Sequence, residues 1–146
     1  MNTISRLQSF SNETAELFSQ SDLNHKRAAA LTACLCAIEL NAFVEPEVQF
    51  AVQCINAENN CDDDTIYKLL ALADKYDNLY FSEIEKSNDE ITSMANNYFL
   101  KARALSALNI YLSKNIFELD EVIYESILST DDTNMMLNII IQSLSN

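Results

Sequence analysis

Apolar residues recur three or four positions apart along most of the chain, whereas the strict alternation typical of strands is scarce. This period predicts helices nearly throughout. The segments that follow it are residues 3–19 with a break near Ser11, 23–43, 47–57, a helix from Asp63 or Asp64 through Ile84, 87–113, 119–129, and a last helix capped by Asp131 or Asp132. The pattern therefore predicts an all-α fold of about six to seven helices.

The segment 23–43, with Asp22 as a candidate N-cap, is predicted to be the central helix. Its stretch from Ala28 to Ile38 is apolar on almost every side, and a helix without a polar face packs inside a domain. Because the connections are short, we expect a compact, mainly antiparallel bundle around this helix, with residues 1–146 forming a single domain. A helical-repeat solenoid is the alternative, although no repeat of fixed period is evident.

Two local signals refine the predicted boundaries. Pro46 suits the first turn of the helix that follows it. The run Ser87-Asn88-Asp89-Glu90 matches a capping box, with serine at the N-cap and glutamate at N3. This box predicts that the helix 87–113 begins at Ser87, with Ile91 and Met94 on its apolar stripe.

The chain contains no glycine, and this absence limits both its turns and its chemistry. Phosphate-binding loops, dinucleotide-binding turns and the G-x-S-x-G elbow of hydrolases all require glycine. Helix ends that need a left-handed residue must use another type, and asparagine tolerates that conformation best. The sequence predicts this role for Asn41, Asn60 and Asn115.

The other reactive side chains do not form a catalytic or metal-binding pattern. Cys34, Cys36, Cys54 and Cys61 are predicted to be buried free thiols in a reducing cytoplasm. His25 is the only histidine and lies too far along its helix from Cys34 to activate it, and the absence of a C-x-x-C pair argues against zinc. We therefore expect no enzyme activity, no catalytic residues, no cofactor and no metal.

Glu39 is an acid within the apolar helix 23–43. Two positions are open to it: it pairs with Lys101 or Arg103 in the interior, or it faces solvent. Either role is favoured over acid–base catalysis, which needs a cleft and shifted pKa values.

Acidic residues outnumber basic ones by 22 to 9, which gives a formal net charge of −13. Between Glu45 and Glu90, twelve acids stand against three lysines. Such a charge repels nucleic acid and anionic lipid and attracts basic proteins. With neither a leader-like segment nor an apolar run of membrane length, we expect a cytoplasmic protein that binds a basic partner, without direct contact to nucleic acid or membrane.

Tyrosines and acids gather between residues 62 and 85. At protein interfaces, tyrosines anchor the contact and carboxylates steer a basic partner toward it. In the alternative interpretation, Tyr80 belongs to the core and the acids form a solvated face. The residues predicted to bind the partner are Asp62, Asp63, Asp64, Asp74, Tyr76, Asp77, Tyr80, Glu83 and Glu85.

These features favour a small non-catalytic inhibitor, such as an immunity protein that neutralises a basic toxin. A toxic nuclease is one such target, because an acidic helical face can occlude an active site that grips phosphates. A face that mimics nucleic acid is a variant of this function. The alternative is a structural or regulatory protein that forms a homodimer through the apolar C-terminal helix, in which Ile140 and Ile141 would be buried.

Three core patterns resemble the YjaG-like family of bacterial helical proteins. They are Ala33-Cys34-Leu35-Cys36 in an early long helix, the later run Ile66–Leu72, and an alanine-rich helix that includes Ala102, Ala104, Leu105, Ala107 and Leu108. The similarity spans roughly residues 26–137. Ala37 and Ile38 depart from it, since the family has charged residues there, and the spacing between the first two patterns is longer here. The resemblance implies an all-α bundle and brings no activity or binding residues with it.

Overall fold

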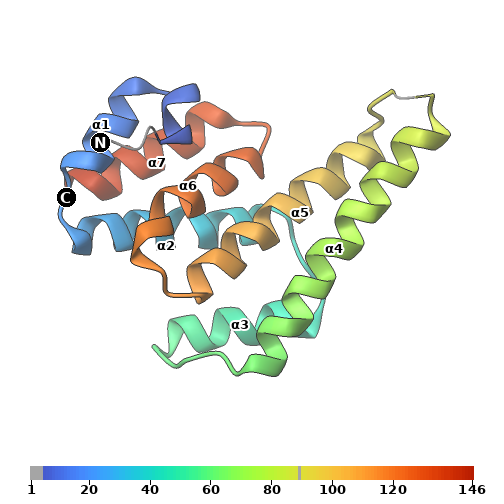
Figure 1. The fold of residues 1–146 in the computed structure, drawn as a ribbon, viewed down its shortest axis with the longest axis horizontal. Helices are drawn as coiled ribbons and strands as arrows, with labels where there is room; N and C mark the ends of the chain where they lie inside the picture. Colours follow the sequence, from blue (N-terminus) through green and yellow to red (C-terminus); the bar gives the residue numbers. More distant parts are fainter. Residues whose placement is uncertain (1–4, 89) are drawn as a thin grey trace.

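Helices form all the regular structure in residues 5–88 and 90–146, the part of the chain that the computed structural model describes (Figure 1). The predicted all-α fold is therefore confirmed. In chain order, the elements are η1 (Arg6–Ser9), α1 (Asn12–Gln20), α2 (Leu23–Leu40), α3 (Pro46–Asn56), α4 (Asp63–Lys86), α5 (Ser93–Leu112), η2 (Ile116–Glu118), α6 (Leu119–Leu128) and α7 (Thr133–Ser145).

The N-terminal break is placed as the sequence predicts. Ser11 separates η1 from α1, and its Oγ accepts a hydrogen bond from the Thr14 backbone N–H at 3.1 Å. A serine in this extended conformation satisfies one of the free N–H groups at a helix start. The predicted helix 3–19 begins within residues 1–4, which lie outside the described part.

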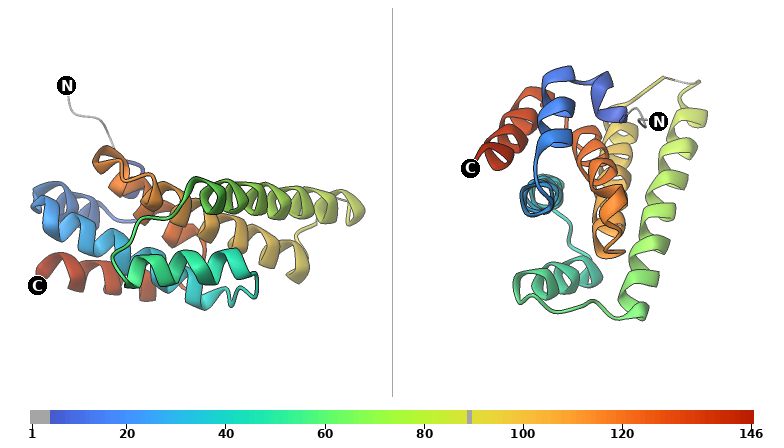
Figure 2. Two further views of the ribbon diagram at one scale, coloured as in Figure 1. Left: turned by 90° about the horizontal axis from the view of Figure 1, so that it is seen from below. Right: turned by 60° about the vertical axis from the view of Figure 1, so that its left-hand side comes forward.

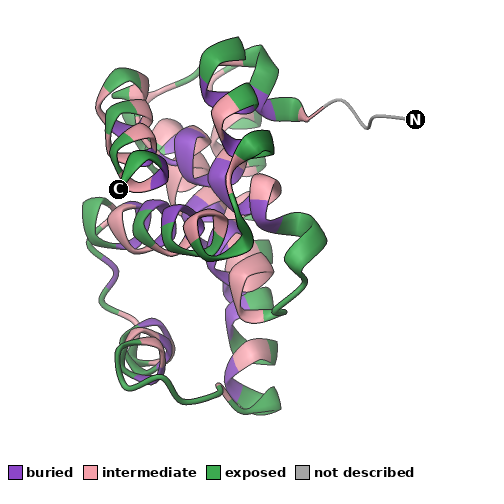
Figure 3. Cartoon of the chain, turned by 90° about the vertical axis from the view of Figure 1, so that its left-hand side faces the viewer, coloured by how far each residue is buried: buried purple, intermediate pink, exposed green. Residues whose placement is uncertain are grey.

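The α2 helix lies at the centre of the bundle and contacts α5, α6 and α7. Its fully buried side chains are mostly alanines, and Figure 3 shows the buried segments gathered where the inner helices meet. Small side chains allow neighbouring helix backbones to approach closely, so the core consists of closely packed helices. The predicted central helix and its N-cap are confirmed, because Asp22 Oδ1 accepts from the His25 backbone N–H at 2.8 Å.

The α2 helix ends at Leu40, three residues before the predicted end at Phe43. The chain reverses at Ala42, which has a φ of 50°. Phe43 then turns back into the core, where its ring meets that of Tyr76 edge-on with centroids 6.2 Å apart. Tertiary burial of this phenylalanine, rather than helical continuation, decides where α2 stops.

The prediction that asparagines supply the left-handed helix ends is wrong at all three positions. The left-handed residues after α2, α3 and α5 are Ala42, Glu58 and Lys114, and a fourth, Asn88, follows α4. Asn41 instead uses its amide to donate to the Ala37 and Ser129 carbonyls, at 2.8 and 3.1 Å. Asn88 tolerates this conformation, whereas Ala42, Glu58 and Lys114 each store about 1–2 kcal/mol of backbone strain.

Replacing Ala42 with glycine is expected to raise the free energy of unfolding by about 0.5–1 kcal/mol. Relief of the left-handed strain exceeds the smaller loss from a more flexible unfolded chain. Urea unfolding followed by far-UV circular dichroism measures the change. Ala71→Gly is the matched control, because Ala71 is exposed inside α4, where the same substitution costs about 1 kcal/mol. Changes of the same sign in both variants would contradict the assignment of strain to Ala42.

The boundaries of α4 and α5 differ from the predicted ones. Asp62 rather than Asp63 or Asp64 caps α4, and its Oδ1 accepts from the Thr65 N–H at 2.8 Å. The predicted start of α5 at Ser87 is wrong: the helix begins at Ser93, with Thr92 as its N-cap. Ser87 cannot serve, since its backbone N–H still bonds the Glu83 carbonyl at the end of α4.

The residues around the predicted capping box are therefore a connection between two helices. Asp89 of that box lies outside the described residues. Ile91 precedes α5 and is exposed, and Met94 in its first turn is exposed as well. Both were expected on the apolar stripe of the helix. The predicted stripe therefore begins too early, because the first buried residue of α5 is Ala95.

The α4 and α5 helices form a long antiparallel hairpin that extends past the rest of the bundle (Figures 1 and 2). Every fully buried residue of α4 lies at or before Leu72. Beyond it, residues 73–86 pack on α5 through partly buried side chains. One long side of α4 is therefore left facing solvent.

The C-terminal elements match the predicted ranges closely. The α6 helix ends one residue before the predicted Ser129, and Asp132, one of the two predicted caps, accepts from the Met135 N–H at 3.1 Å to begin α7. The buried residues of α7 are Met136, Ile140 and Leu144. They pack into the core of this same chain.

Candidate protein-binding surface on α4

The solvent-facing side of α4 carries large apolar side chains between carboxylates. Tyr67, Leu70 and Phe81 are 73%, 50% and 64% exposed. Residues three, four or seven apart lie on the same side of a helix, so these three share a face with nearby acids. We call this face the outer face of α4; it consists of Asp63, Tyr67, Leu70, Asp74, Phe81 and Glu85.

Tyr76, by contrast, turns toward α3. Its hydroxyl donates to Glu45 Oε2 at 2.6 Å, and burial together with this carboxylate raises the pKa of Tyr76. Burial acts to raise the pKa of Glu45, but hydrogen bonds from Tyr76 and the backbone outweigh it and hold that pKa low. The Lys101 ammonium lies 4.6 Å from the centre of the Phe43 ring beside this pair. Tyr76 therefore ties α4 to the start of α3.

Asp77 turns toward α5 and α6, where it joins a partly buried ionic cluster. Arg103 Nη2 lies 3.3 Å from an Asp77 oxygen, and Arg103 Nη1 lies 3.1 Å from a Glu125 oxygen. Ser106 adds a hydrogen bond to Glu125 at 3.3 Å. One guanidinium thus bridges carboxylates from two helices, and a carboxylate held in this way is engaged inside the fold.

Tyr80 and Glu83 also lie toward the hairpin interior. The Tyr80 ring packs against Phe81 and Phe99, with centroids 5.3 and 5.4 Å apart. Glu83 is partly buried, and its carboxylate lies 3.6 Å from the Lys86 ammonium. The contact between Tyr80 and Phe99 joins the two helices of the hairpin, whereas the pair between Glu83 and Lys86 lies within α4.

At the start of α4, the three consecutive aspartates have different surroundings. Asp62 is the N-cap, and hydrogen bonds from the Thr65 side chain and backbone lower its pKa. Asp63 is exposed, as is Asp64, which pairs with Lys68 at 3.1 Å. The helix N-terminus favours negative charge here.

The structure thus divides the nine predicted residues by their surroundings. Asp63, Asp64, Asp74 and Glu85 are exposed carboxylates, and of these Asp64 pairs with Lys68 on the same helix. Tyr76, Asp77 and Tyr80 contact other elements, whereas Asp62 is an exposed N-cap and Glu83 pairs with Lys86 within α4. The predicted set of binding residues leaves out the three exposed apolar side chains of this face, Tyr67, Leu70 and Phe81. Their signal was a second set of apolar positions on the same helix, out of register with the buried Leu69 and Leu72.

The remaining reactive side chains have structural surroundings. Burial raises the pKa of the Cys34 thiol to about 12, and burial together with the Cys54 thiol raises that of Cys61 to about 11. Both thiols are therefore protonated at neutral pH and weakly nucleophilic. Glu39 is exposed, so the alternative in which it faces solvent is the correct one. The partners considered for it, Lys101 and Arg103, are engaged elsewhere.

His25 contacts the N-cap of its own helix and the residue that follows α7. Its Nδ1 lies 2.8 Å from Asp22 Oδ1, and its Nε2 contacts the Asn146 carbonyl. Hydrogen bonding to these two groups raises the pKa of the imidazole. Within residues 5–88 and 90–146, no three His, Cys, Asp or Glu side chains converge as metal ligands.

The fold and surface define an all-α bundle with an acidic and aromatic helix face. Comparison of the chain with protein-family models, with curated proteins and with solved structures found no match. The resemblance to YjaG-like proteins therefore stays a prediction. Across the described ranges, none of the helices combines the length and apolar character that crossing a membrane requires.

Proposed function

We propose that this protein is a non-catalytic inhibitor of the immunity-protein type, which binds a basic toxin such as a nuclease and occludes its active site. The outer face of α4 is the binding surface. The observation that carries the proposal is that this face presents three large apolar side chains between carboxylates, on a hairpin that extends beyond the bundle.

The composition of the outer face fits a protein partner of positive charge. Exposed aromatic side chains are typical anchors of protein interfaces, because they bury a large area and lose little conformational entropy. Asp63, Asp74 and Glu85 flank them, and the net charge of −13 steers a basic partner toward the molecule. The same charge disfavours direct binding to nucleic acid or to an anionic membrane.

A cytoplasmic location is part of the proposal. All four cysteines are free thiols, a state that the reducing cytoplasm maintains. An inhibitor in that compartment would meet the toxin before it reached its target.

Charge reversal on the outer face tests the proposal. The partner to assay is a basic toxin encoded beside the gene for this chain, with its nuclease activity titrated by the purified protein. Asp74→Lys/Glu85→Lys is expected to weaken inhibition by about tenfold or more, and Phe81→Ala by about tenfold. Inhibition by the unchanged protein should weaken as salt rises, because exposed charges are screened.

Glu13→Lys/Glu16→Lys is the matched control, since it makes the same change in net charge on exposed positions of α1. It should inhibit nearly as well as the unchanged protein. Equal losses in the two double variants would refute the outer face as the binding surface. A gene surrounded by metabolic genes, without a basic toxin, would count against the function itself.

A homodimer through α7 is the alternative function. Ile140, expected at such an interface, is fully buried in the core of its own chain, whereas Asn134, Asn138 and Gln142 occupy the exposed side of α7. Light scattering distinguishes the two states: the inhibitor proposal expects the 16.5 kDa monomer, and the alternative expects twice that mass.

A further inference from the structure

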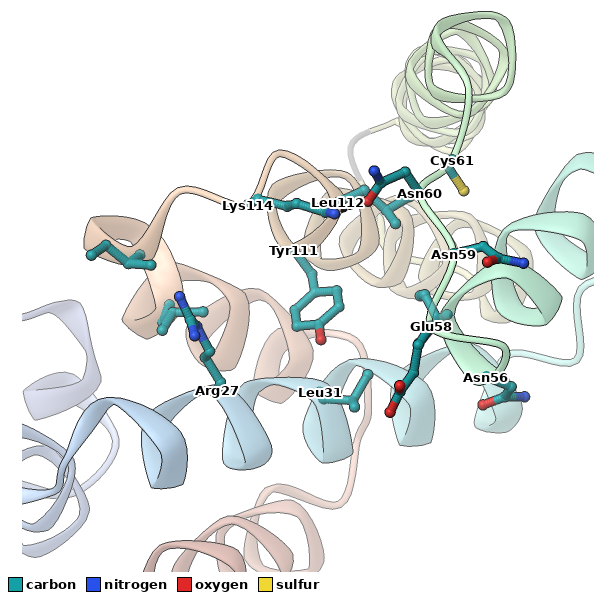
Figure 4. A pocket seen from close by; sticks show the side chains of 13 residues that line it. Arg27, Leu31, Asn56, Glu58, Asn59, Asn60, Cys61, Tyr111, Leu112 and Lys114 are labelled. Carbon is teal, nitrogen blue, oxygen red and sulfur yellow. Dashed lines mark hydrogen bonds between the residues drawn. The ribbon is translucent and has the colours of Figure 1, made fainter.

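A pocket of about 710 Å³ opens where α2, the loop from α3 to α4 and the end of α5 meet (Figure 4). This volume lies in the range of sites that take small organic ligands, about 300–1,000 Å³. Figure 4 shows Arg27 on α2 at one side, Glu58 at the other, and Tyr111 between them, while Lys114 points toward Asn60. The pocket does not involve the outer face of α4.

The pocket carries more positive than negative side chains, in contrast to the molecule as a whole. Arg27 and Lys114 both line it, and Glu58 is the one acid among the described lining residues. In the described part of the chain, neither cation has a carboxylate within ion-pair distance. In a chain with 9 basic and 22 acidic residues, two unneutralised cations at one cavity favour an anionic ligand group.

The other walls supply hydrogen-bonding amides and an apolar surface. Asn60 accepts a hydrogen bond from Lys114 through its oxygen, which leaves its N–H groups free to donate to a ligand. Leu31 and Leu112 provide apolar wall, and burial raises the pKa of Tyr111 beside them. Apolar walls with a few placed polar groups are the usual composition of a small-molecule site.

Two strained backbone positions also lie at this pocket. Glu58 and Lys114, with φ of 58° and 61°, are two of the four left-handed residues in the described part of the chain, and both line the pocket. Glycine at these positions would relieve the strain but would remove the charged side chains from the rim. Strain that coincides with a cavity and its charged groups is a recognised mark of functional sites.

We propose that this pocket binds a small amphipathic anion: Lys114, beside Asn60, contacts its anionic group, Arg27 adds positive charge across the pocket, and the apolar wall packs against its hydrocarbon body. The site is independent of the proposed function, since it uses other residues and needs no protein partner. Carboxylate, phosphate and sulfate groups share the chemistry that the two cations recognise.

Decanoate, decanol and decylamine, used below their micelle concentrations, are the probes for this site. They share one hydrocarbon chain and differ in the charge of the head group. Decanoate is expected to bind at least tenfold more tightly than decanol by calorimetry, and to shift the amide resonances of the pocket residues. Absence of decanoate binding, binding at another place, or equal affinity for decanol or decylamine would overturn the proposal.

Two glycine variants separate binding from stability. Lys114→Gly removes both the strain and a cation, so its urea midpoint should not fall while its affinity for decanoate drops about tenfold. Ala42→Gly relieves the same kind of strain away from this pocket and should retain full affinity. Arg27→Gln/Lys114→Gln should abolish the preference for decanoate over decanol. Unchanged preference in that double variant, or unchanged affinity in Lys114→Gly, contradicts the assigned roles.

Discussion

Replacing Arg103 with methionine is expected to lower the free energy of unfolding by about 3 kcal/mol. The Glu125 side chain is only 9% exposed, and Arg103 is its ionic partner. Removing one member of a buried ion pair leaves an uncompensated charge in the interior, which typically costs about 3–5 kcal/mol. The side chain of Arg103 is 23% exposed, so the lower end of that range applies. Urea unfolding followed by circular dichroism measures the loss.

Two further variants show whether the unpaired Glu125 carboxylate causes the loss of stability. Arg103→Met/Glu125→Met removes the cation and the more buried of its two carboxylates, and leaves Asp77, whose side chain is 35% exposed. This variant should recover stability to within about 1 kcal/mol of the unchanged protein. Arg6→Met breaks the more exposed pair between Arg6 and Glu121 and should cost about 1 kcal/mol or less. Failure of the double variant to recover would show that the loss does not come from the buried Glu125 carboxylate, and would leave the pairing with Asp77 and the packing of the Arg103 side chain as its sources.

Replacing Ala33 with leucine is expected to cost about 3 kcal/mol, because larger side chains strain a well-packed core. Ala33 is completely buried on α2, and protein interiors are close-packed, so added carbons must displace neighbouring side chains. The measurement is again the urea midpoint and slope.

Ala28→Leu makes the same chemical change on the exposed side of α2. It should leave the free energy of unfolding within about 0.5 kcal/mol, since leucine is nearly as good a helix former as alanine. Similar stabilities for the two leucine variants would mean that close helix contact at α2 does not hold the core together.

The helix content and the central position of α2 could be predicted because the apolar period is strong and α2 lacks a polar face. The boundaries were harder, since they depend on contacts distant in sequence. Phe43 leaves α2 to pack on Tyr76 of α4, and no local pattern reports that contact. The run at Ser87 matches a capping box but does not begin a helix, because Ser87 already ends α4.

The sequence predicted the location of the candidate surface on α4 but not its exact residues. The sequence located the acids and tyrosines of α4, but it could not show which of them turn inward. In the sequence, Asp77 and Tyr76 have the polar character of surface residues. Only the folded chain places Arg103 beside Asp77 and Glu45 beside Tyr76. The pocket at Arg27 could not be foreseen, because its walls come from helices that are neighbours only in the folded chain.

The uneven burial of α4 divides the helix into parts of different local stability. Residues 73–86 contain no fully buried side chain, whereas the first half is anchored by Thr65, Leu69 and Leu72. Segments with few buried contacts open at lower free energy than the core does. The outer half of α4 can therefore open while α2 and its neighbours stay closed. A partner bound along the outer face of α4 would slow amide hydrogen exchange most in residues 73–86, because the first half is already protected by its buried side chains, and the core would keep its own rate.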